Sequence, residues 1–514
     1  MAIKRLTIGP RNHRSRTWPE GTDTDTGTVF SGRLPHLPEL VVMIDAELLR
    51  EPPPSPFLGH DEFDPEGLLS GLLLHKFVRL YRYADNGPPP SVRPEPPPEE
   101  RPVHTGWVVL DPPNPNHPGR RVVFFREAPT SYTTSAVIGN AADVAAADTT
   151  TDAYRALEAV GASERRRADG LAEQVAEQGV HADVYVTRRE YLAKATRRMN
   201  RETTVCTPEE ALTLVSLYLR QQGEFIAAKP DRGSEFVMNR GLFYWVAARE
   251  LLPEAWRWFA ACAQHSAKVA DDRMTYLGQS LLQRVARALE ARDAVHVSSN
   301  QPQDNDLKDE ALANTDEVLV LLMGAVDVTA RVAHKAAGLP DGDVRHAGWQ
   351  NQQWLRELGG QAPRVAELFV PESQLSDVIT VLRLLRNSVH GVALQGLSLM
   401  EDNRPMRNLV GLPQDDEAKL LEAIARLGGC KRWSVVTHPR PLGSIFEPAT
   451  LVDVLFEHVI KLLNAVMSRT PVEDLEGVHL AAEHLGPPSA RGPNSTWDPF
   501  EEWTRLSIRW QLGF

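Results

Sequence analysis

The feature that most constrains the fold is a change of sequence pattern near residue 226. Before it, short apolar segments alternate with helical stretches, and after it most segments carry apolar residues at three- and four-residue spacing. Continuous apolar strands alternating with helices are typical of a parallel sheet covered by helices. Three- and four-residue spacing indicates amphipathic helices. We therefore expect an α/β unit with a parallel-type sheet over residues 36–225, followed by a predominantly α-helical bundle.

Strand-like segments in the first half include Leu40–Ile44, which ends at Asp45, and residues 182–187. Residues 107–110 and 122–125 flank a proline-rich connection and are candidates to pair with each other. Thr207, followed by Pro208 and by Glu210 three residues later, predicts a helix start with a capping box. These signals support one α/β unit that ends near residue 225.

The remaining segments are assigned by composition. We expect an N-terminal extension at 1–35, a proline-rich insertion at 86–119, a helical connecting region at 226–306, a helical bundle at 307–475, and a linker with a C-terminal amphipathic helix at 476–514. Residues 88–118 contain 12 prolines, which exclude a helix or a central strand through most of this insertion. It is either a stiff surface loop or a docking site for a proline-recognising module.

The C-terminal helix places four apolar side chains on one stripe, which we expect to pack on its own chain: Phe500, Trp503, Leu506 and Trp510.

Charge and cysteine content limit the class of protein. The 514-residue chain has a net charge of −12, which argues against coating nucleic acid through overall charge but allows a local basic surface. Three cysteines cannot form a disulfide framework and have no metal-ligand spacing, so a reducing cytoplasm is expected. The longest apolar run, at 318–326, is too short to span a membrane. Signatures of P-loop ATPases, Rossmann dehydrogenases, α/β-hydrolases and zincins are absent.

The strongest candidate for chemistry is the segment from Arg383 to Gly391, at the end of a predicted helix. Helical spacing puts Arg383, Asn387 and His390 on one face, with Arg386 four residues before His390. Arginine can bind a phosphodiester with its planar fork, and histidine can transfer a proton near neutral pH. The same residues are also typical of a helix C-terminus, where basic side chains favour the dipole and glycine caps the helix. Both interpretations remain open at this point.

The sequence RNSVHG at 386–391 resembles the arginine–histidine motif of the HEPN superfamily, and residues 316–334 resemble the first long helix of those domains. The resemblance covers residues 307–470 and includes LGG…KRWSVV before the last helix. It implies a small all-α domain, often dimeric, found in RNases of toxin–antitoxin and antiviral systems. The family usually places four to six residues between arginine and histidine, a spacing that Arg383 fits and Arg386 does not.

The α/β unit resembles a PIN-type nuclease domain in a strand that ends at Asp45 and in the later segment ADVYVTRREYLA. That resemblance implies carboxylates around Mg²⁺ or Mn²⁺ at the strand ends, since hard cations prefer oxygen ligands. Asp45 matches the first acid, while Arg188 and Arg189 occupy the position of a later one. Asp45, Asp183 and Glu209 are equally compatible with capping or surface roles.

A basic segment follows directly and is a candidate RNA-binding surface: Arg188, Arg189, Lys194, Arg197, Arg198 and Arg201. A solvated helix face is the structural alternative.

The resemblance to HEPN RNases, taken with the composition, implies a cytoplasmic endoribonuclease of prokaryotic stress or antiviral defence. It would act on RNA without a metal or other cofactor and form a homodimer or larger complex through the bundle. Arg383, Arg386, Asn387 and His390 would be its catalytic residues. One alternative is a non-catalytic scaffold or sensor in which both domains are degenerate. A second is a metal-dependent PIN-type nuclease at Asp45.

Overall fold

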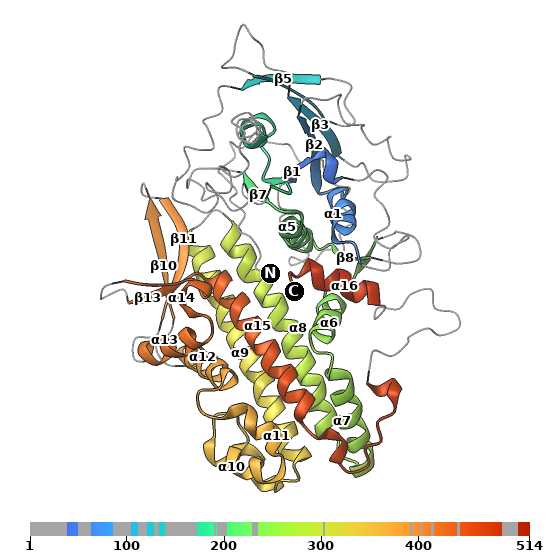
Figure 1. Cartoon of the computed structure of the whole chain (residues 1–514), viewed down its shortest axis with the longest axis vertical. Helices are drawn as coiled ribbons and strands as arrows, with labels where there is room; N and C mark the ends of the chain where they lie inside the picture. The colour runs from blue at the N-terminus through green and yellow to red at the C-terminus, as the bar shows by residue number, and fades with distance from the viewer. Residues whose placement is uncertain are drawn as a thin grey trace, which may run out of the picture. The chain divides into compact units, whose positions relative to one another are not determined.

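The computed structural model (Figure 1) describes residues 39–49, 63–85, 104–110, 121–127, 133–138, 172–189, 192, 203–228, 235–301, 304–390, 394–401, 404–412, 416–438, 443–485 and 502–514. The chain forms two compact units. Unit 1 contains residues 3–237 and 510–514, and unit 2 contains residues 238–509. Among the predicted segments, 1–35 and most of the proline-rich insertion lie outside the described residues.

Unit 1 is built on a seven-stranded sheet with the strand order β5-β4-β3-β2-β1-β6-β7. Strands β3, β2, β1, β6 and β7 are parallel, and β4 and β5 extend the sheet in antiparallel fashion. The antiparallel β3–β4 pair confirms the expected pairing of 107–110 with 122–125. The strand bounds are β1 Leu40–Asp45, β2 Val78–Asp85, β3 His104–Leu110, β4 Arg121–Glu127, β5 Thr133–Ile138, β6 Val184–Val186 and β7 Thr204–Cys206.

Strand β1, an interior strand of the sheet, is apolar from Leu40 to Ile44 because both faces of the sheet are covered. Leu40, Val42 and Ile44 belong to a core shared with α1 (Pro65–Leu73) and α5 (Pro208–Gln221). Val41 and Met43 belong to a second core, which includes buried residues of a π-helical turn at Val175–Gly179. The prediction of a parallel sheet covered by helices is confirmed for this half of the chain.

Helix α5 begins with the predicted capping box. Thr207 Oγ1 accepts a hydrogen bond from the Glu210 amide at 3.3 Å, and the Glu210 carboxylate accepts one from the Thr207 amide at 3.0 Å. Two amide groups that the helix cannot satisfy internally are thereby paired. The sequence signal and the structure agree at this helix start.

The last residues of the chain belong to unit 1. The Trp510 ring stacks on Phe63 with centroids 6.4 Å apart, and the Gln511 side-chain amide donates to the Ile226 carbonyl at 2.9 Å. Within α16 (Glu502–Gln511), Ser507 and Ile508 are fully buried, whereas Trp510 is half-buried. The predicted stripe therefore packs on its own chain at Trp510, although smaller side chains are buried more deeply.

Unit 2 is mostly helical, as expected, and the long helices α8, α9 and α15 pack together (Figure 1). The polar segment near 301–304 joins α8 to α9 within this one unit. The helix bounds are α6 Arg240–Leu251, α7 Ala255–Val269, α8 Arg273–Asn300, α9 Asn305–Ala336, α10 Gln352–Gln361, α11 Pro363–Ala366, α12 Gln374–His390, α13 Glu417–Arg426, α14 Gly429–Arg432 and α15 Pro448–Arg469.

Two small sheets were not predicted. β8 (Phe225–Ala228) pairs with β9 (Glu235–Met238), and a four-stranded sheet with the order β10-β11-β13-β12 forms between α12 and α15 in the sequence. Its strands are β10 Gln395–Glu401, β11 Arg404–Gly411, β12 Val435–Thr437 and β13 Ser444–Phe446. The helical region therefore contains a sheet as well as the bundle.

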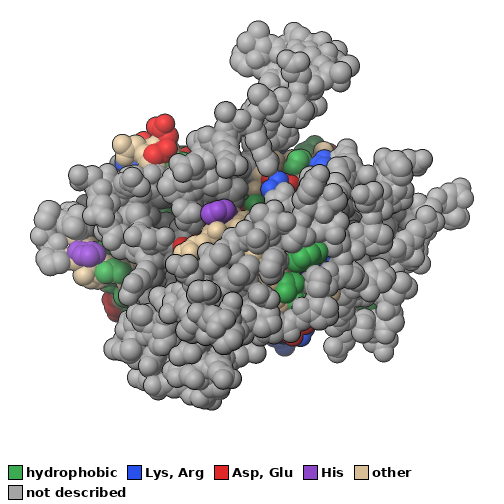
Figure 2. Space-filling model, turned by 90° about the horizontal axis from the view of Figure 1, so that it is seen from above, with side chains coloured by type: hydrophobic (Ala, Val, Ile, Leu, Met, Phe, Trp, Pro, Cys, Tyr) green, Lys and Arg blue, Asp and Glu red, His purple; other side chains and the backbone are tan. Residues whose placement is uncertain are grey.

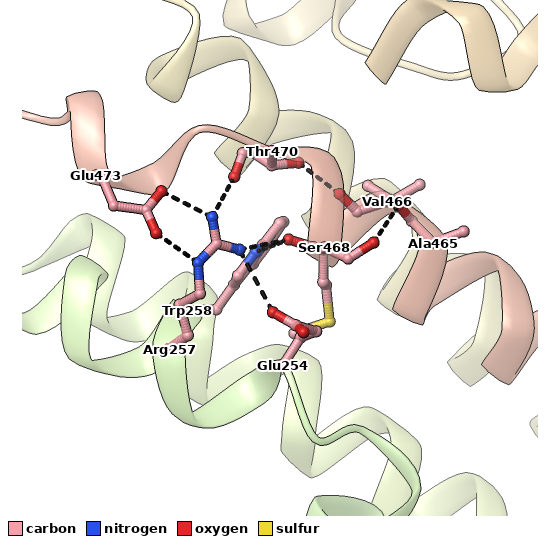
Figure 3. Close-up of polar contacts among 9 residues, drawn as sticks. Glu254, Arg257, Trp258, Ala465, Val466, Ser468, Thr470 and Glu473 are labelled. Atoms are coloured by element: carbon pink, nitrogen blue, oxygen red, sulfur yellow. Dashed lines mark hydrogen bonds and ion pairs between the residues drawn. The ribbon is translucent and has the colours of Figure 1, made fainter. Parts of the chain in front are cut away.

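The C-terminal end of α15 is held by α7 (Figure 3). The Arg257 guanidinium donates to the carbonyl oxygens of Met467 at 2.8 Å and Thr470 at 3.0 Å, and it also binds the Glu473 carboxylate. The Trp258 indole donates to the same Met467 carbonyl at 2.9 Å. Carbonyl groups at a helix end have no partner within the helix, and these donors from α7 supply hydrogen bonds to two of the carbonyls at this end.

Candidate functional site

A cleft of about 400 Å³ opens in unit 2 and contains three of the four predicted catalytic residues. It is formed by one face of α12, by Met323 of α9 and by the segment that leads into α10. Its lining residues are Met323, Trp349, Gln350, Gln352, Ser376, Ile379, Thr380, Arg383, Arg386 and Asn387.

The α12 side of the cleft follows directly from helix geometry. Ser376, Thr380, Arg383 and Asn387 succeed one another at intervals of four, three and four residues, which places them on one face. Leu382 and Leu385 occupy another face and are fully buried. Because the apolar face fixes the rotation of α12, the polar face is directed to the cleft.

The two arginines of the cleft form no close ion pair with a described carboxylate. Among the described residues, neither Arg383 nor Arg386 has an acidic oxygen within 4.0 Å, and both are half-buried. Arg386 Nη1 donates a hydrogen bond to the Asn387 side-chain oxygen at 3.4 Å. Two guanidinium groups that share a cleft, and that have no close carboxylate partner among the described residues, favour an anionic ligand.

A carboxyl group of α9 lies in the electrostatic field of this cluster. Burial raises the pKa of Asp327 above its ordinary value, while Arg386, Arg331 and Arg284 act in the opposite direction. Sequence reasoning did not identify Asp327, Arg331 or Arg284. The available signal was a charged residue within an apolar helix, followed four residues later by an arginine.

Trp349, which lines the cleft, is held by contacts with two other segments. Its indole nitrogen donates to Thr329 Oγ1 at 2.9 Å and to the Val326 carbonyl at 3.2 Å, and its ring stacks on Phe369 with centroids 4.5 Å apart. Trp349 is only 4% exposed, so it shapes the cleft rather than offering a surface for stacking. Gln350 and Gln352 are exposed and supply amide groups on the cleft wall.

His390 is the last residue of α12. Its side chain lies outside the part of the structure that is described. The structure thus brings together Arg383, Arg386 and Asn387, and for His390 it gives the position in the helix alone.

In unit 1, Asp45 lies at the carboxyl end of β1 and is buried. Its two carboxylate oxygens accept hydrogen bonds from the hydroxyls of Tyr185 and Thr187, each at 2.7 Å. Burial raises the pKa of Asp45, and the two hydroxyl donors oppose that shift. The carboxylate therefore joins β1 to the end of β6, the strand next to it in the sheet.

Of the other two acids considered, only Asp183 is placed away from Asp45 by the strand directions. Asp183 precedes β6 and accepts a hydrogen bond from the Val41 amide at 2.8 Å. It therefore lies at the amino ends of the parallel strands, whereas Asp45 lies at their carboxyl ends. Glu209 lies in the first turn of α5. Within the described ranges, no group of three or more histidine, cysteine or acidic side chains is arranged to hold a metal ion.

The predicted basic segment is described only at its beginning. The Arg188 guanidinium forms an ion pair with Glu66, which is the main cause of the raised pKa of Arg188, and it also lies in the fields of Glu47 and Glu209. Arg189 is half-buried. The remaining four residues lie outside the described part: Lys194, Arg197, Arg198 and Arg201. On the face shown in Figure 2, the basic side chains that are described are visible only as small separate areas.

Comparisons of the chain with models of protein families, with curated proteins and with solved structures found no match. Among the helices that the structure describes, none combines the length and apolar character needed to cross a membrane.

Proposed function

We propose that unit 2 is an endoribonuclease that cleaves RNA without a metal ion, with a HEPN-like active site in the α12 cleft. The observation that carries this proposal is the joint placement of Arg383, Arg386 and Asn387 in one cleft with no carboxylate partner for either arginine among the described residues. A helix C-terminal cap needs only one or two basic residues near the last turn. It does not account for Arg383, which lies two turns earlier and lines the cleft.

The chemistry uses the RNA's own nucleophile. The 2′-hydroxyl attacks the adjacent phosphorus and gives up its proton, the bond from phosphorus to the 5′-oxygen breaks, and that oxygen takes up a proton. The products are a 2′,3′-cyclic phosphate and a 5′-hydroxyl. In this scheme His390 transfers the proton, Arg383 and Arg386 stabilise the charge on the phosphorane, and Asn387 orients the imidazole or a phosphate oxygen.

The broader assignment rests on the motif resemblance together with the acidic, low-cysteine composition. We infer a cytoplasmic protein of a prokaryotic stress or antiviral defence system that forms a homodimer or larger complex through the helices of unit 2. Unit 1, with its PIN-like features, would bind RNA or a regulatory ligand. The carboxylate of Asp45, already engaged by two hydroxyls, favours this role over metal-dependent cleavage.

The test is cleavage of a labelled RNA in the presence of EDTA. Arg383→Ala and His390→Ala should each slow cleavage by about 10²–10⁴-fold, the usual contribution of a group that acts in proton transfer or charge stabilisation. Arg364→Ala is the matched control because Arg364 is exposed on α11 and does not line the cleft. Cleavage by His390→Ala at the parental rate would remove the proposal, and a stable protein complex without RNA turnover would support the scaffold alternative.

A further inference from the structure

Arg284 of α8 lies directly over the backbone of α9 at Gly324. A Cβ atom added at Gly324 would be 2.8 Å from Arg284 Cζ and closer still to Nη1, which is less than real Cβ contacts allow. The glycine therefore makes room for the guanidinium. Arg284 Nε donates to Ser280 Oγ at 3.1 Å, which holds the side chain in that position.

The same surface of α9 leads from Arg284 to the cleft. Met323, Asp327 and Arg331 follow one another at four-residue intervals and share a face of α9, and Met323 lines the cleft. Asp327 lies in the fields of Arg386 from α12, Arg331 from α9 and Arg284 from α8. Three helices thus direct arginines to one region beside the cleft.

This region carries an excess of positive charge. Within the described ranges, none of Arg284, Arg331 and Arg386 has a carboxylate oxygen within 4.0 Å, so Asp327 does not form a close ion pair with any of them. Like charges gathered around one half-buried acid repel one another, and that repulsion is relieved when a polyanion binds.

We propose that Arg284 and Arg331 form a second phosphate subsite, which binds the RNA phosphate next to the one that is cleaved. This inference rests on the proposed function, because it assigns the path of the same substrate beyond the α12 cleft. Arginine suits the task because its planar group binds phosphate oxygens in pairs. Gly324 is part of the subsite because its missing side chain admits the Arg284 guanidinium.

The test measures binding separately from cleavage. The full-length protein is titrated with a fluorescent single-stranded RNA whose 2′-hydroxyls are methylated, so that the cleavage nucleophile is absent, at several salt concentrations. Arg284→Ala and Arg331→Ala should each weaken binding and reduce the slope of log affinity against log salt by about 0.7, the value for one lost phosphate contact on a single strand.

Gly324→Ala tests the position of the Arg284 guanidinium without changing the charge of the protein. The new methyl group should displace the Arg284 side chain, which is flexible enough to move without unfolding α9, so binding should weaken as in Arg284→Ala although the net charge is unchanged. Gly360→Ala is the matched control, since Gly360 is also helical and a Cβ there meets nothing within 4 Å. In cleavage assays on ordinary RNA, Arg284→Ala should raise KM by a larger factor than it lowers kcat.

The outcomes distinguish the two levels of inference. If cleavage depends on Arg383 and His390 while Arg284→Ala, Arg331→Ala and Gly324→Ala bind the methylated RNA with parental affinity and salt slope, the second subsite is wrong and the proposed function stands. If the parental protein neither binds nor cleaves RNA, both are wrong. If Gly324→Ala binds RNA as the Gly360→Ala control does while Arg284→Ala loses affinity, the inclusion of Gly324 in the subsite is wrong.

Discussion

A buried group of charged side chains joins α8 to α15. Arg292 Nε and His296 Nε2 both contact Asp453 Oδ1, at 2.6 and 2.8 Å, and all three residues are nearly or fully buried. Burial would raise the pKa of Asp453, but attraction from Arg292 and His296 holds it well below its ordinary value. The carboxylate is therefore required in its charged form.

Asp453→Asn should destabilise unit 2 by about 3–5 kcal/mol, because it leaves Arg292 as a buried cation without its counter-charge. A carboxyl with a depressed folded-state pKa contributes stability that is present above the unfolded pKa of about 3.9 and is lost as pH falls below it. The difference between parent and variant should thus be full at pH 7 and shrink progressively below about pH 4. Urea unfolding across this range measures it.

Asp343→Asn is the control for that series, since Asp343 is exposed on a short 3₁₀ turn. Equal free energies of unfolding at pH 7 for Asp453→Asn and Asp343→Asn would contradict the importance of the buried group.

The two helix ends described above differ in whether their capping interactions can be predicted from the sequence. The start of α5 was predictable because Thr207 and Glu210 are three residues apart and act on each other. The donor that caps the end of α15 was not predictable, because Arg257 precedes the accepting carbonyl of Met467 by 210 positions. Local caps are recorded in short motifs, whereas caps supplied by another helix depend on the tertiary fold.

Arg257→Ala should remove one charged donor from each of the Met467 and Thr470 carbonyls, which keep the Trp258 indole and the Val472 amide. We expect a loss of stability of about 2 kcal/mol, the usual contribution of hydrogen bonds from a charged group. Amide hydrogen exchange should accelerate in residues 466–478 more than in α5. Arg257→Lys should rescue only part of the effect because one ammonium group cannot reproduce the planar fork. Unchanged amide hydrogen exchange at the end of α15 would contradict a stabilising role of Arg257 there.

The part of the candidate site that lies on α12 was predictable from the sequence, and the part contributed by other segments was not. The common face of Arg383, Arg386 and Asn387 follows from the period of a single helix, which is a local property. Trp349, Asp327 and Arg284 reach the same region from other segments, and no spacing rule links them to α12. The strands β10–β13 were missed for a related reason: short alternating segments acquire their conformation mainly from neighbouring strands.

At the scale of the whole chain, two units with separate cores allow the activity to be assigned to one of them. Asp45→Asn alters the one acid of unit 1 that was proposed as a metal ligand, and Asn can still accept a hydrogen bond from Tyr185 or Thr187. If the proposed active site in unit 2 is correct, RNA cleavage by Asp45→Asn should remain within about twofold of the parental rate, with EDTA or with Mn²⁺.

The comparison variant for this experiment is Arg383→Ala. Activity that appears with Mn²⁺, persists in Arg383→Ala and disappears in Asp45→Asn would move the reaction to unit 1 and support the metal-dependent alternative. Circular dichroism of both variants shows whether either has lost its fold.

The glycine at position 324 also bears on attempts to make the protein more heat-resistant. In the interior of a long helix, alanine is favoured over glycine by about 1 kcal/mol, so Gly324 is an obvious target for a stabilising exchange. The Arg284 guanidinium occupies the space that the methyl group of alanine would need. If the second phosphate subsite is correct, Gly324→Ala would therefore raise the stability of α9 and lower the affinity for RNA. The weakest residue of α9 by intrinsic propensity would then be retained because of the substrate and not because of the fold.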